Sequence, residues 1–375
     1  MAASTLAQTL DALTADGELY EPLADGSVRC HACGHRCLIR PGRRGICQVR
    51  FNAGGRLRVP WGYVGALQCD PTEKKPFFHL LPGSDTLTFG MLGCDLHCPN
   101  CQNWINSQAL RDPASELAGA GPTPITPQQL IALARQNGAQ IVGSSYNEPL
   151  ITSEWAAAVF REAVGAGLKC VYISNGNATP EALEFLRPYL AGYKIDLKTM
   201  SDRNYRRLGA VLETVLDTAR RVHALGLWLE MVTLVIPGFN DSDAELRDAA
   251  QFIAALSPDI PWHVTAFHAD YKMTGPEYRD TRARDLLRAA EIGRAAGLRY
   301  VYAGNLPGQV GEHEHTFCPA CRARLIERSG YVILSYRLTA QGTCPECGAR
   351  IAGLWTDRPE TVRLFGPGRP RRPAR

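Results

Sequence analysis

Apolar residues in the middle of the chain recur with two alternating periods. Short runs rich in β-branched and aromatic residues stand between longer segments whose apolar residues recur three and four positions apart. Strands that alternate with helices in this way are typical of parallel strands joined by crossover helices. The sequence therefore predicts an α/β fold with about six βα units from Thr86 onward, which fits a partial (β/α)6 TIM-like barrel.

The boundaries of these elements follow from proline, glycine and capping residues. The predicted strands cover residues 86–90, 140–144, 170–173, 192–197, 227–236, 262–267 and 298–302. The predicted helices cover residues 127–135, 153–166, 180–190, 212–225, 243–256 and 281–296. In barrels of this kind the chemistry lies at the C-terminal ends of the strands. Polar residues that directly follow a strand are therefore the candidates for function.

A chain of 375 residues is long for one domain and is predicted to contain several units. The regions expected are an N-terminal region with a four-cysteine metal motif (1–85), a core barrel (86–305), a zinc-ribbon-like domain (306–360) and a disordered basic tail (361–375). Residues 1–29 are expected to form a short helix followed by a loop. Proline and glycine dominate the tail and nothing apolar anchors it, which predicts disorder there.

Charge and cysteine content narrow the class of protein. The net charge is +4, and the tail alone supplies four arginines, so the body is close to neutral. A neutral body is not the footprint of a nucleic-acid-binding domain. The sequence has neither a run of about 18 apolar residues nor a basic segment before an apolar one, so we expect no membrane span and no secretory signal. Thirteen cysteines then indicate metal sites in a reducing cytoplasm.

Three cysteines, Cys94, Cys98 and Cys101, stand at a C-x3-C-x2-C spacing just after the first predicted strand. A tetrahedral zinc ion or a closed iron–sulfur cube takes four ligands, and no fourth cysteine is near in sequence. Three thiolates can hold three irons of a [4Fe–4S] cluster and leave the fourth iron open. S-adenosylmethionine, chelated through its amino and carboxylate groups, is the candidate for that open iron.

The same loop resembles the signature of the radical S-adenosylmethionine superfamily. Segments similar to a narrower group, the radical enzyme of the AmmeMemoRadiSam system, cover residues 70–76, 78–79, 82–84, 93–94 and 101–104. That group is itself close to the activating enzymes of glycyl-radical proteins, such as pyruvate formate-lyase activating enzymes. The resemblance extends from about residue 19 to residue 355. It implies a partial barrel, a reducing partner such as flavodoxin or ferredoxin, and partners like the Memo and Ammecr proteins.

The resemblance also implies contacts to the methionine part of the cofactor. Activases carry a Gly-Gly-Glu-Pro run after the second strand, and this chain matches it at Glu148 and Pro149. Tyr146 and Asn147 replace the two glycines, so Asn147 is included among the implied contacts. The alternative for Glu148 is a structural acid at a helix N-terminus.

Two further strand ends match the activase pattern in part. Ser174 and Asn175 are implied ligands of the methionine or ribose, but Ile173 replaces the aspartate of the family's cation site. Asp196 and Lys198 match an Asp-Leu-Lys run, where the lysine binds the cofactor carboxylate; a surface ion pair is the alternative. The cofactor-binding set implied in this way is Asn147, Glu148, Ser174, Asn175, Asp196, Lys198 and His268. A lone histidine such as the last of these is also often only a packing residue.

Two more cysteine groups predict further metal sites. The N-terminal group, with glycines that let the backbone wrap a metal, consists of Cys30, Cys33, Cys37 and Cys47. Its four thiolates predict a closed site, and the spacing leaves zinc and a second iron–sulfur cluster both open. A structural or substrate-facing role is favoured over an electron relay. Nearby arginines could steer an acidic partner or substrate.

The C-terminal group forms two C-x2-C knuckles that bracket a hairpin-like stretch with a strand at residues 331–336. Its members are Cys318, Cys321, Cys344 and Cys347. This spacing predicts a zinc ribbon with a closed structural zinc. So small a unit cannot bury enough surface to fold alone, so the metal is expected to supply its stability.

Three functions are compatible with these patterns. The first is a radical enzyme of the AmmeMemoRadiSam type that acts on an unidentified small molecule or protein. The second is a strict glycyl-radical activase, which the missing aspartate at Ile173 and the two extra metal units disfavour. The third is a metal-stabilised sensor or nucleic-acid-binding module, disfavoured by the neutral body and the three-cysteine loop.

Overall fold

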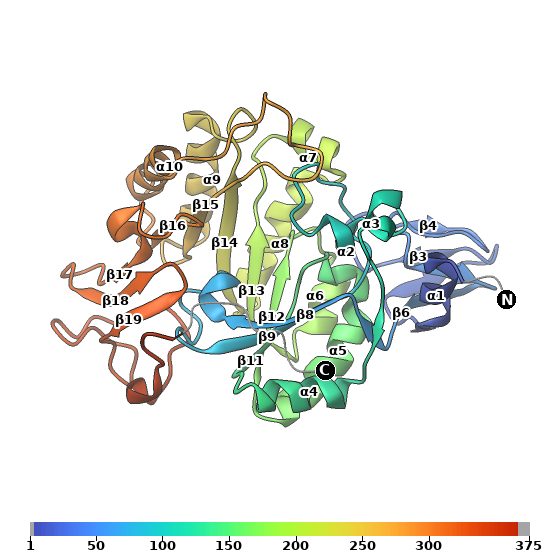
Figure 1. The fold of residues 1–375 in the computed structure, drawn as a ribbon, viewed down its shortest axis with the longest axis horizontal. Coiled ribbons are helices and arrows are strands. Elements are labelled where there is room, and N and C mark those ends of the chain that lie inside the picture. The colour runs from blue at the N-terminus through green and yellow to red at the C-terminus, as the bar shows by residue number, and fades with distance from the viewer. Residues whose placement is uncertain (1–3, 367–375) are drawn as a thin grey trace.

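The computed structural model describes residues 4–366 and is built around one eight-stranded sheet (Figure 1). Its strand order is β16-β15-β14-β13-β12-β11-β9-β8, with all neighbours parallel except β8 against β9. The strands are β8 (Ala66–Pro71), β9 (Asp85–Gly90), β11 (Ile141–Ser144), β12 (Lys169–Ser174), β13 (Leu190–Asp196), β14 (Trp228–Val235), β15 (Trp262–Ala266) and β16 (Val301–Gly304). The predicted α/β class with a mostly parallel sheet is confirmed.

Helices connect the parallel strands, as predicted. They are α4 (Pro127–Gln136), α5 (Ser153–Gly165), α6 (Pro180–Leu186), α8 (Leu212–Ala224), α9 (Asp243–Leu256) and α10 (Ala283–Ala295). The first begins at a capping box made by Thr126 and Gln129. The third ends four residues before its predicted end, because Pro188 has no backbone N–H with which to continue the helical hydrogen bonds.

Several short helical elements lie outside these connections, and only the first of them was predicted. They are α1 (Leu6–Ala12), which corresponds to the expected N-terminal helix, and the unexpected α2 (Trp104–Ser107), α3 (Pro113–Leu117), α7 (Asp202–Leu208), η1 (Thr72–Lys74), η2 (Pro149–Thr152), η3 (Gly311–Glu314) and η4 (Pro359–Thr361). Most are one or two turns long, and such turns carry too few residues to show a helical period.

The N-terminal region forms two small antiparallel sheets at one end of the molecule (Figure 1). Their strands are β1 (Thr14–Asp16), β2 (Tyr20–Pro22), β3 (Val28–Cys30), β4 (Leu38–Ile39), β5 (Phe51–Ala53) and β6 (Arg56–Pro60). A two-stranded ladder of β7 (Tyr63–Val64) and β10 (Thr123–Pro124) follows. The prediction of a loop after α1 is therefore wrong, because short strands occupy much of this stretch. Thr14 pairs with Pro60, and such distant pairing leaves no local pattern.

The C-terminal region forms a three-stranded antiparallel sheet at the opposite end (Figure 1). Its strands are β17 (Thr316–Phe317), β18 (Arg324–Ser329) and β19 (Val332–Tyr336), the last as predicted. The disordered tail predicted over 361–375 is wrong for residues 361–366. Arg363 donates to Asp85 at 2.8 Å, and the Phe365 N–H donates to the Ile333 carbonyl at 2.9 Å. Residues 367–375 lie outside the described part of the chain.

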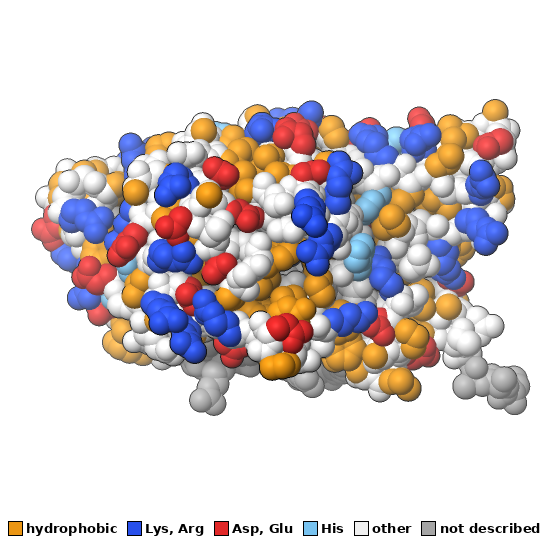
Figure 2. All heavy atoms as spheres, turned by 90° about the horizontal axis from the view of Figure 1, so that it is seen from above, with side chains coloured by type: hydrophobic (Ala, Val, Ile, Leu, Met, Phe, Trp, Pro, Cys, Tyr) orange, Lys and Arg blue, Asp and Glu red, His pale blue; other side chains and the backbone are white. Residues whose placement is uncertain are grey.

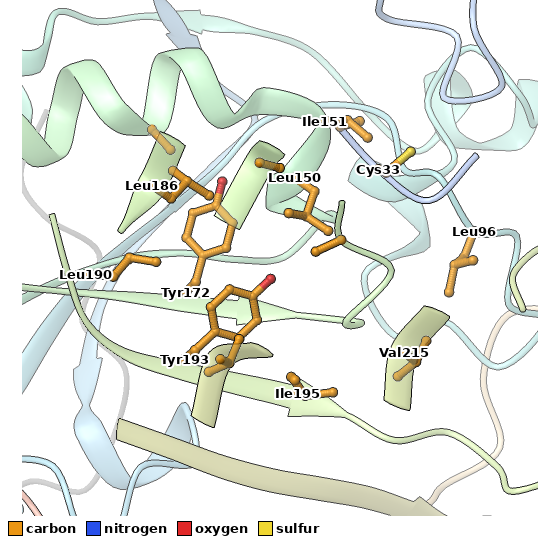
Figure 3. Packing of buried hydrophobic residues seen from close by; sticks show 14 of the residues in the cluster. Cys33, Leu96, Leu150, Ile151, Tyr172, Leu186, Leu190, Tyr193, Ile195 and Val215 are labelled. Atoms are coloured by element: carbon orange, nitrogen blue, oxygen red, sulfur yellow. The ribbon is translucent and has the colours of Figure 1, made fainter. Parts of the chain in front are cut away.

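One continuous hydrophobic core joins the N-terminal region to the sheet. Tyr172 and Tyr193 project from neighbouring strands toward Leu150 and Leu186 (Figure 3).

Figure 2 shows Lys and Arg side chains interspersed with Asp and Glu over one face. Among residues 4–366 no helix is both long enough and apolar enough to cross a membrane.

Candidate functional site

A cavity of about 340 Å³ opens at the C-terminal ends of the parallel strands. Its lining includes the three cysteines of the central loop and six of the seven predicted cofactor contacts: Cys94, Cys98, Cys101, Asn147, Glu148, Ser174, Asn175, Asp196 and Lys198. His268 is absent from the lining. Its side chain is 60% exposed, and its Nδ1 lies 3.0 Å from the Gln102 amide nitrogen. The structure thus brings together every predicted contact but that histidine.

Close backbone approaches shape the cysteine loop. A Cβ on Gly90 would lie 2.4 Å from the Ser145 carbonyl oxygen, so only glycine fits there. Gly93 has a φ of +89°, and a Cβ there would lie 2.9 Å from the Cys47 carbonyl oxygen. Arg111 donates to the carbonyls of Cys94 and Leu96 and fixes the loop from outside.

The three central thiols fit an open-site cluster. Burial raises the pKa of Cys98 to about 11, opposed by the nearby Lys198 charge. Burial and then the Asp95 charge raise the pKa of Cys94. A bound metal deprotonates such thiols outright. No fourth cysteine lines this cavity, so one iron of a bound cube would face the polar residues.

Glu148 is held tightly at the base of the cavity. Its Oε1 accepts from the Leu150 N–H and the Ser174 hydroxyl, and its Oε2 accepts from the Asn175 N–H at 2.6 Å. Burial, and then the Asp95 charge, raise its pKa to about 8. Glu148 thus caps η2, as its structural alternative requires, and it also lines the cavity; its contact to the cofactor stays a prediction.

The residues that replace the two glycines keep the loop's shape. Tyr146 adopts a φ of +72°, a left-handed conformation that favours glycine. Its hydroxyl lies 3.2 Å from Lys75 Nζ, whose ammonium also pairs with Asp70. Asn147 Oδ1 accepts from the Met91 N–H at 3.0 Å, which ties this loop to the end of β9.

Asp95 is a buried residue that the sequence reasoning missed. Its two carboxylate oxygens accept from the side-chain amides of Asn175 and Asn177, each at 2.8 Å. Asp95 follows Cys94 directly, so these bonds tie the cysteine loop to the end of β12. The Asn175 side chain therefore positions the cluster loop in addition to lining the cavity.

Asp196 and Lys198, the acid and the base expected on one side of β13, both line the cavity. The Asp196 carboxylate pairs with Lys194, and its other oxygen lies 3.7 Å from Lys198 Nζ. Burial opposes both charges, but mutual attraction wins: the pKa of Asp196 is lowered and that of Lys198 is raised. Two lysines share one carboxylate, so the group can accept a further anion.

The wall opposite the cysteines was not predicted. Glu73 is fully buried, and its Oε2 has no hydrogen-bond partner among the described residues. Burial raises its pKa to about 7, although Arg328 opposes the shift. The His263 Nε2–H donates to the buried Glu230 carboxylate at 2.6 Å, and the Tyr331 hydroxyl donates to Asn305 at 3.0 Å. Tyr331 follows β18, so the C-terminal unit forms part of this wall.

The four C-terminal cysteines form a compact site. Their sulfurs all lie within 4.8 Å of one another, and no other such group is found within residues 4–366. The Cys318–Cys347 and Cys321–Cys344 sulfur pairs are each 3.6 Å apart. Four sulfurs placed about 2.3 Å from one zinc ion in a tetrahedron stand about 3.8 Å apart. The geometry therefore fits a single tetrahedral metal ion.

The four N-terminal cysteines lie near one another but less compactly. Cys30, Cys33 and Cys47 are buried and Cys37 is half-buried. Burial, then the charge of Asp95 and then those of the other three thiols raise the pKa of Cys33. No residue from 30 to 47 lines the cavity, so the structure lends no support to the substrate-facing placement.

Comparison with known proteins agrees with this site. The sequence profile of the radical SAM superfamily matches residues 89–253, which include the central cysteines. An uncharacterised protein of Methanocaldococcus jannaschii, MJ0808, is 35% identical over 337 residues, covering 88% of this chain and 97% of the relative. Isethionate sulfite-lyase activating enzyme of Oleidesulfovibrio alaskensis is 26% identical over 145 residues, 37% of this chain and 46% of that enzyme.

Among solved structures, a domain of pyruvate-formate lyase-activating enzyme from Bacteroides vulgatus matches with 19% identity and a TM-score of 0.39. The match covers 44% of this chain and 98% of that domain. Family membership rests instead on the superfamily profile and on the M. jannaschii relative, which matches over most of its length. The chain belongs to the radical SAM superfamily, in one family with the M. jannaschii protein, and is a radical SAM enzyme.

Proposed function

We propose that this chain holds an open-site [4Fe–4S] cluster on Cys94, Cys98 and Cys101 and binds S-adenosylmethionine beside it, as the radical enzyme of an AmmeMemoRadiSam-type system. When bound and reduced, these cofactors supply a 5′-deoxyadenosyl radical that abstracts a hydrogen atom from the substrate. The observation that supports this most is one cavity lined by three thiols, no fourth cysteine and six polar residues at strand ends.

The chain's own residues would bind and orient the cofactor. Lys198 supplies a positive charge for the methionine carboxylate, and Asp196 holds that lysine in place. We infer that Glu148 and Asn147, which line the cavity, contact the amino group, and that Ser174 contacts the ribose or methionine. His268, on the exposed rim, stays a prediction as a ribose contact.

The remaining parts of the proposal concern setting and partners. We infer a structural zinc in the C-terminal unit, supported by the sulfur spacing. We infer a reducing cytoplasm, supported by the high content of thirteen cysteines, most of them in groups with metal-ligand spacing. A flavodoxin or ferredoxin would supply electrons, and Memo-like and Ammecr-like proteins would be partners. The substrate is an unidentified small molecule or protein.

A second candidate is a glycyl-radical enzyme activase. The partial match to an isethionate sulfite-lyase activating enzyme favours it. The absence of an acidic residue at position 173, where Ile173 stands, disfavours it. Formation of a stable radical on a partner polypeptide, seen by electron paramagnetic resonance, would favour the activase over the first proposal.

The test is production of 5′-deoxyadenosine by the anaerobically reconstituted, reduced protein. Separate Cys94→Ala, Cys98→Ala and Cys101→Ala variants should each lose it, because each removes one of only three cluster ligands. Cys170→Ala is the matched control, since Cys170 lies on β12, is buried and does not line the cavity. Full turnover by any of the three ligand variants would refute the proposal.

A further inference from the structure

The N-terminal cysteine segment packs directly against the central cysteine loop and the end of β12. Cys33 forms a β-bridge with Ala178, and the Gly34 N–H donates to the Asn177 carbonyl at 2.8 Å. The His35 ring lies 3.1 Å from the carbonyl oxygen of Asp95, the residue after Cys94. The two cysteine groups are thus neighbours in space.

Hydrogen bonds and apolar packing hold the two groups together. Arg111 donates to the Ile46 carbonyl and to the Cys94 carbonyl, each at 2.9 Å, so one guanidinium bridges both loops. Asn177, which accepts the Gly34 N–H, also donates to Asp95. Cys33 and Leu96 belong to the same hydrophobic cluster (Figure 3). The protein between the two groups is therefore packed and short.

The distances between thiol sulfurs distinguish a site for one metal ion from a site for a four-iron cluster. In the C-terminal unit the sulfurs have the close spacing of ligands that share one ion. No three of the N-terminal thiols lie within 4.8 Å of one another, and the same holds for the central three. Ligands of a four-iron cube each bind a different iron, so their sulfurs stand farther apart than those around one zinc.

The outer side of the segment is suited to a protein partner. Leu38 and Ile46 are 52% and 47% exposed and flank the half-buried Cys37. Arg40 and Arg43 are exposed beside them, and neither has an ion pair within 4.0 Å among residues 4–366. An apolar patch with an unpaired basic rim fits a small acidic electron carrier.

We propose that Cys30, Cys33, Cys37 and Cys47 hold a second [4Fe–4S] cluster, closed by a thiolate on every iron, which relays electrons from an acidic one-electron carrier toward the central site. The carrier is oxidised by one electron, and the second cluster is reduced and then reoxidised as the central site is reduced. No bond is made or broken. The relay role rests on the proposed function, whereas the presence of the cluster does not.

The first test measures metal in a full-length variant that lacks the central ligands, Cys94→Ser/Cys98→Ser/Cys101→Ser. After anaerobic reconstitution it should keep one four-iron cluster and one zinc per chain. When reduced, its electron paramagnetic resonance signal should not change on addition of S-adenosylmethionine, because no iron is open. Adding Cys30→Ser and Cys33→Ser should remove the iron and leave the zinc, which reports a folded chain. Cys170→Ala should match the wild type.

Two outcomes would overturn the second cluster: a triple variant that carries two zinc ions and no iron, or a signal that S-adenosylmethionine perturbs. The relay is tested with Arg40→Glu/Arg43→Glu, which leaves all ligands intact. Flavodoxin should reduce the clusters of this variant at least tenfold more slowly than those of the wild type, while dithionite should reduce both proteins at the same rate. Equal rates with flavodoxin would refute the relay and leave the cluster itself and the central chemistry standing.

Discussion

The buried ion pair between Arg50 and Glu154 should be the strongest single link between the N-terminal region and the helices that cover the central sheet. Both side chains are 1% exposed, and the pair is bidentate, with N–O distances of 2.7 and 2.8 Å. Glu154 Oε1 also accepts the backbone N–H groups of Glu18 and Leu19, each at 3.2 Å. One carboxylate at the start of α5 thus holds two N-terminal segments.

Glu154→Gln keeps the shape of the side chain but leaves the Arg50 charge buried and unpaired. Removing one partner of a buried pair costs about 3–5 kcal/mol, which corresponds to a hundred- to several-thousand-fold change in an equilibrium. Arg50→Met/Glu154→Leu removes both charges, so it should lose much less than the single variant.

The effect can be read by hydrogen–deuterium exchange of the metal-loaded protein at pH 7. Amides of β5, β6 and the start of α5 should lose at least a hundred-fold in protection in Glu154→Gln. Glu162→Gln is the matched control, because Glu162 lies on the same helix and is exposed. A loss under tenfold, or a double variant as unstable as the single one, would refute the reasoning.

The pH dependence of this link has a defined sign. Burial opposes the charge of Glu154, but Arg50 outweighs it and lowers the pKa below its usual value of 4.5. The stabilisation is therefore present above about pH 4.5 and is lost as the pH falls through the lower, folded-state pKa. Exchange in Glu154→Gln should not show this acid-dependent loss.

Three further predictions concern the cavity and the ribbon. Lys198→Met should weaken S-adenosylmethionine binding about ten- to a hundred-fold in equilibrium dialysis, because a charge-assisted hydrogen bond is lost; unchanged binding would contradict its role. The wild type should lose stability in urea titrations as the pH rises from 4.5 to 7, because the raised pKa of Glu73, about 7, favours its protonated form when folded. Glu73→Gln should abolish this loss, and an unaltered pH profile would exclude Glu73 as its cause. Cys321→Ser should remove one zinc per chain and expose β17–β19 to exchange; full zinc content would be inconsistent with the ribbon.

Local sequence patterns predicted much of the fold. Apolar periodicity placed each parallel strand within a few residues, because a buried strand and an amphipathic helix each imprint their own period. The short N-terminal strands were missed, since most have only two or three residues and show no period, and β1 pairs with β6 across more than forty residues. Residues 361–366 were misread because a proline- and glycine-rich segment can still be anchored by single contacts such as Arg363 with Asp85.

The choice of histidine shows what strand geometry adds. His268 follows β15 in a loop and lies on the exposed rim. His263 and Thr265, two residues apart within β15, both face the cavity, because alternate side chains of a strand share one face. Asp95, Glu73 and Tyr331 carry no local signal, since their positions depend on partners far away in the chain.

The sequence by itself determined how many cysteines each group contains, because cysteine identity and spacing are local. It thereby predicted one three-cysteine site and two four-cysteine sites. Only the tertiary structure decided how far apart those thiols stand and which loops face each other. The N-terminal cysteines meet the central loop through Arg111 and Asn177, and the closer sulfur spacing of the C-terminal group also arises from tertiary packing, because its two knuckles are far apart in the chain.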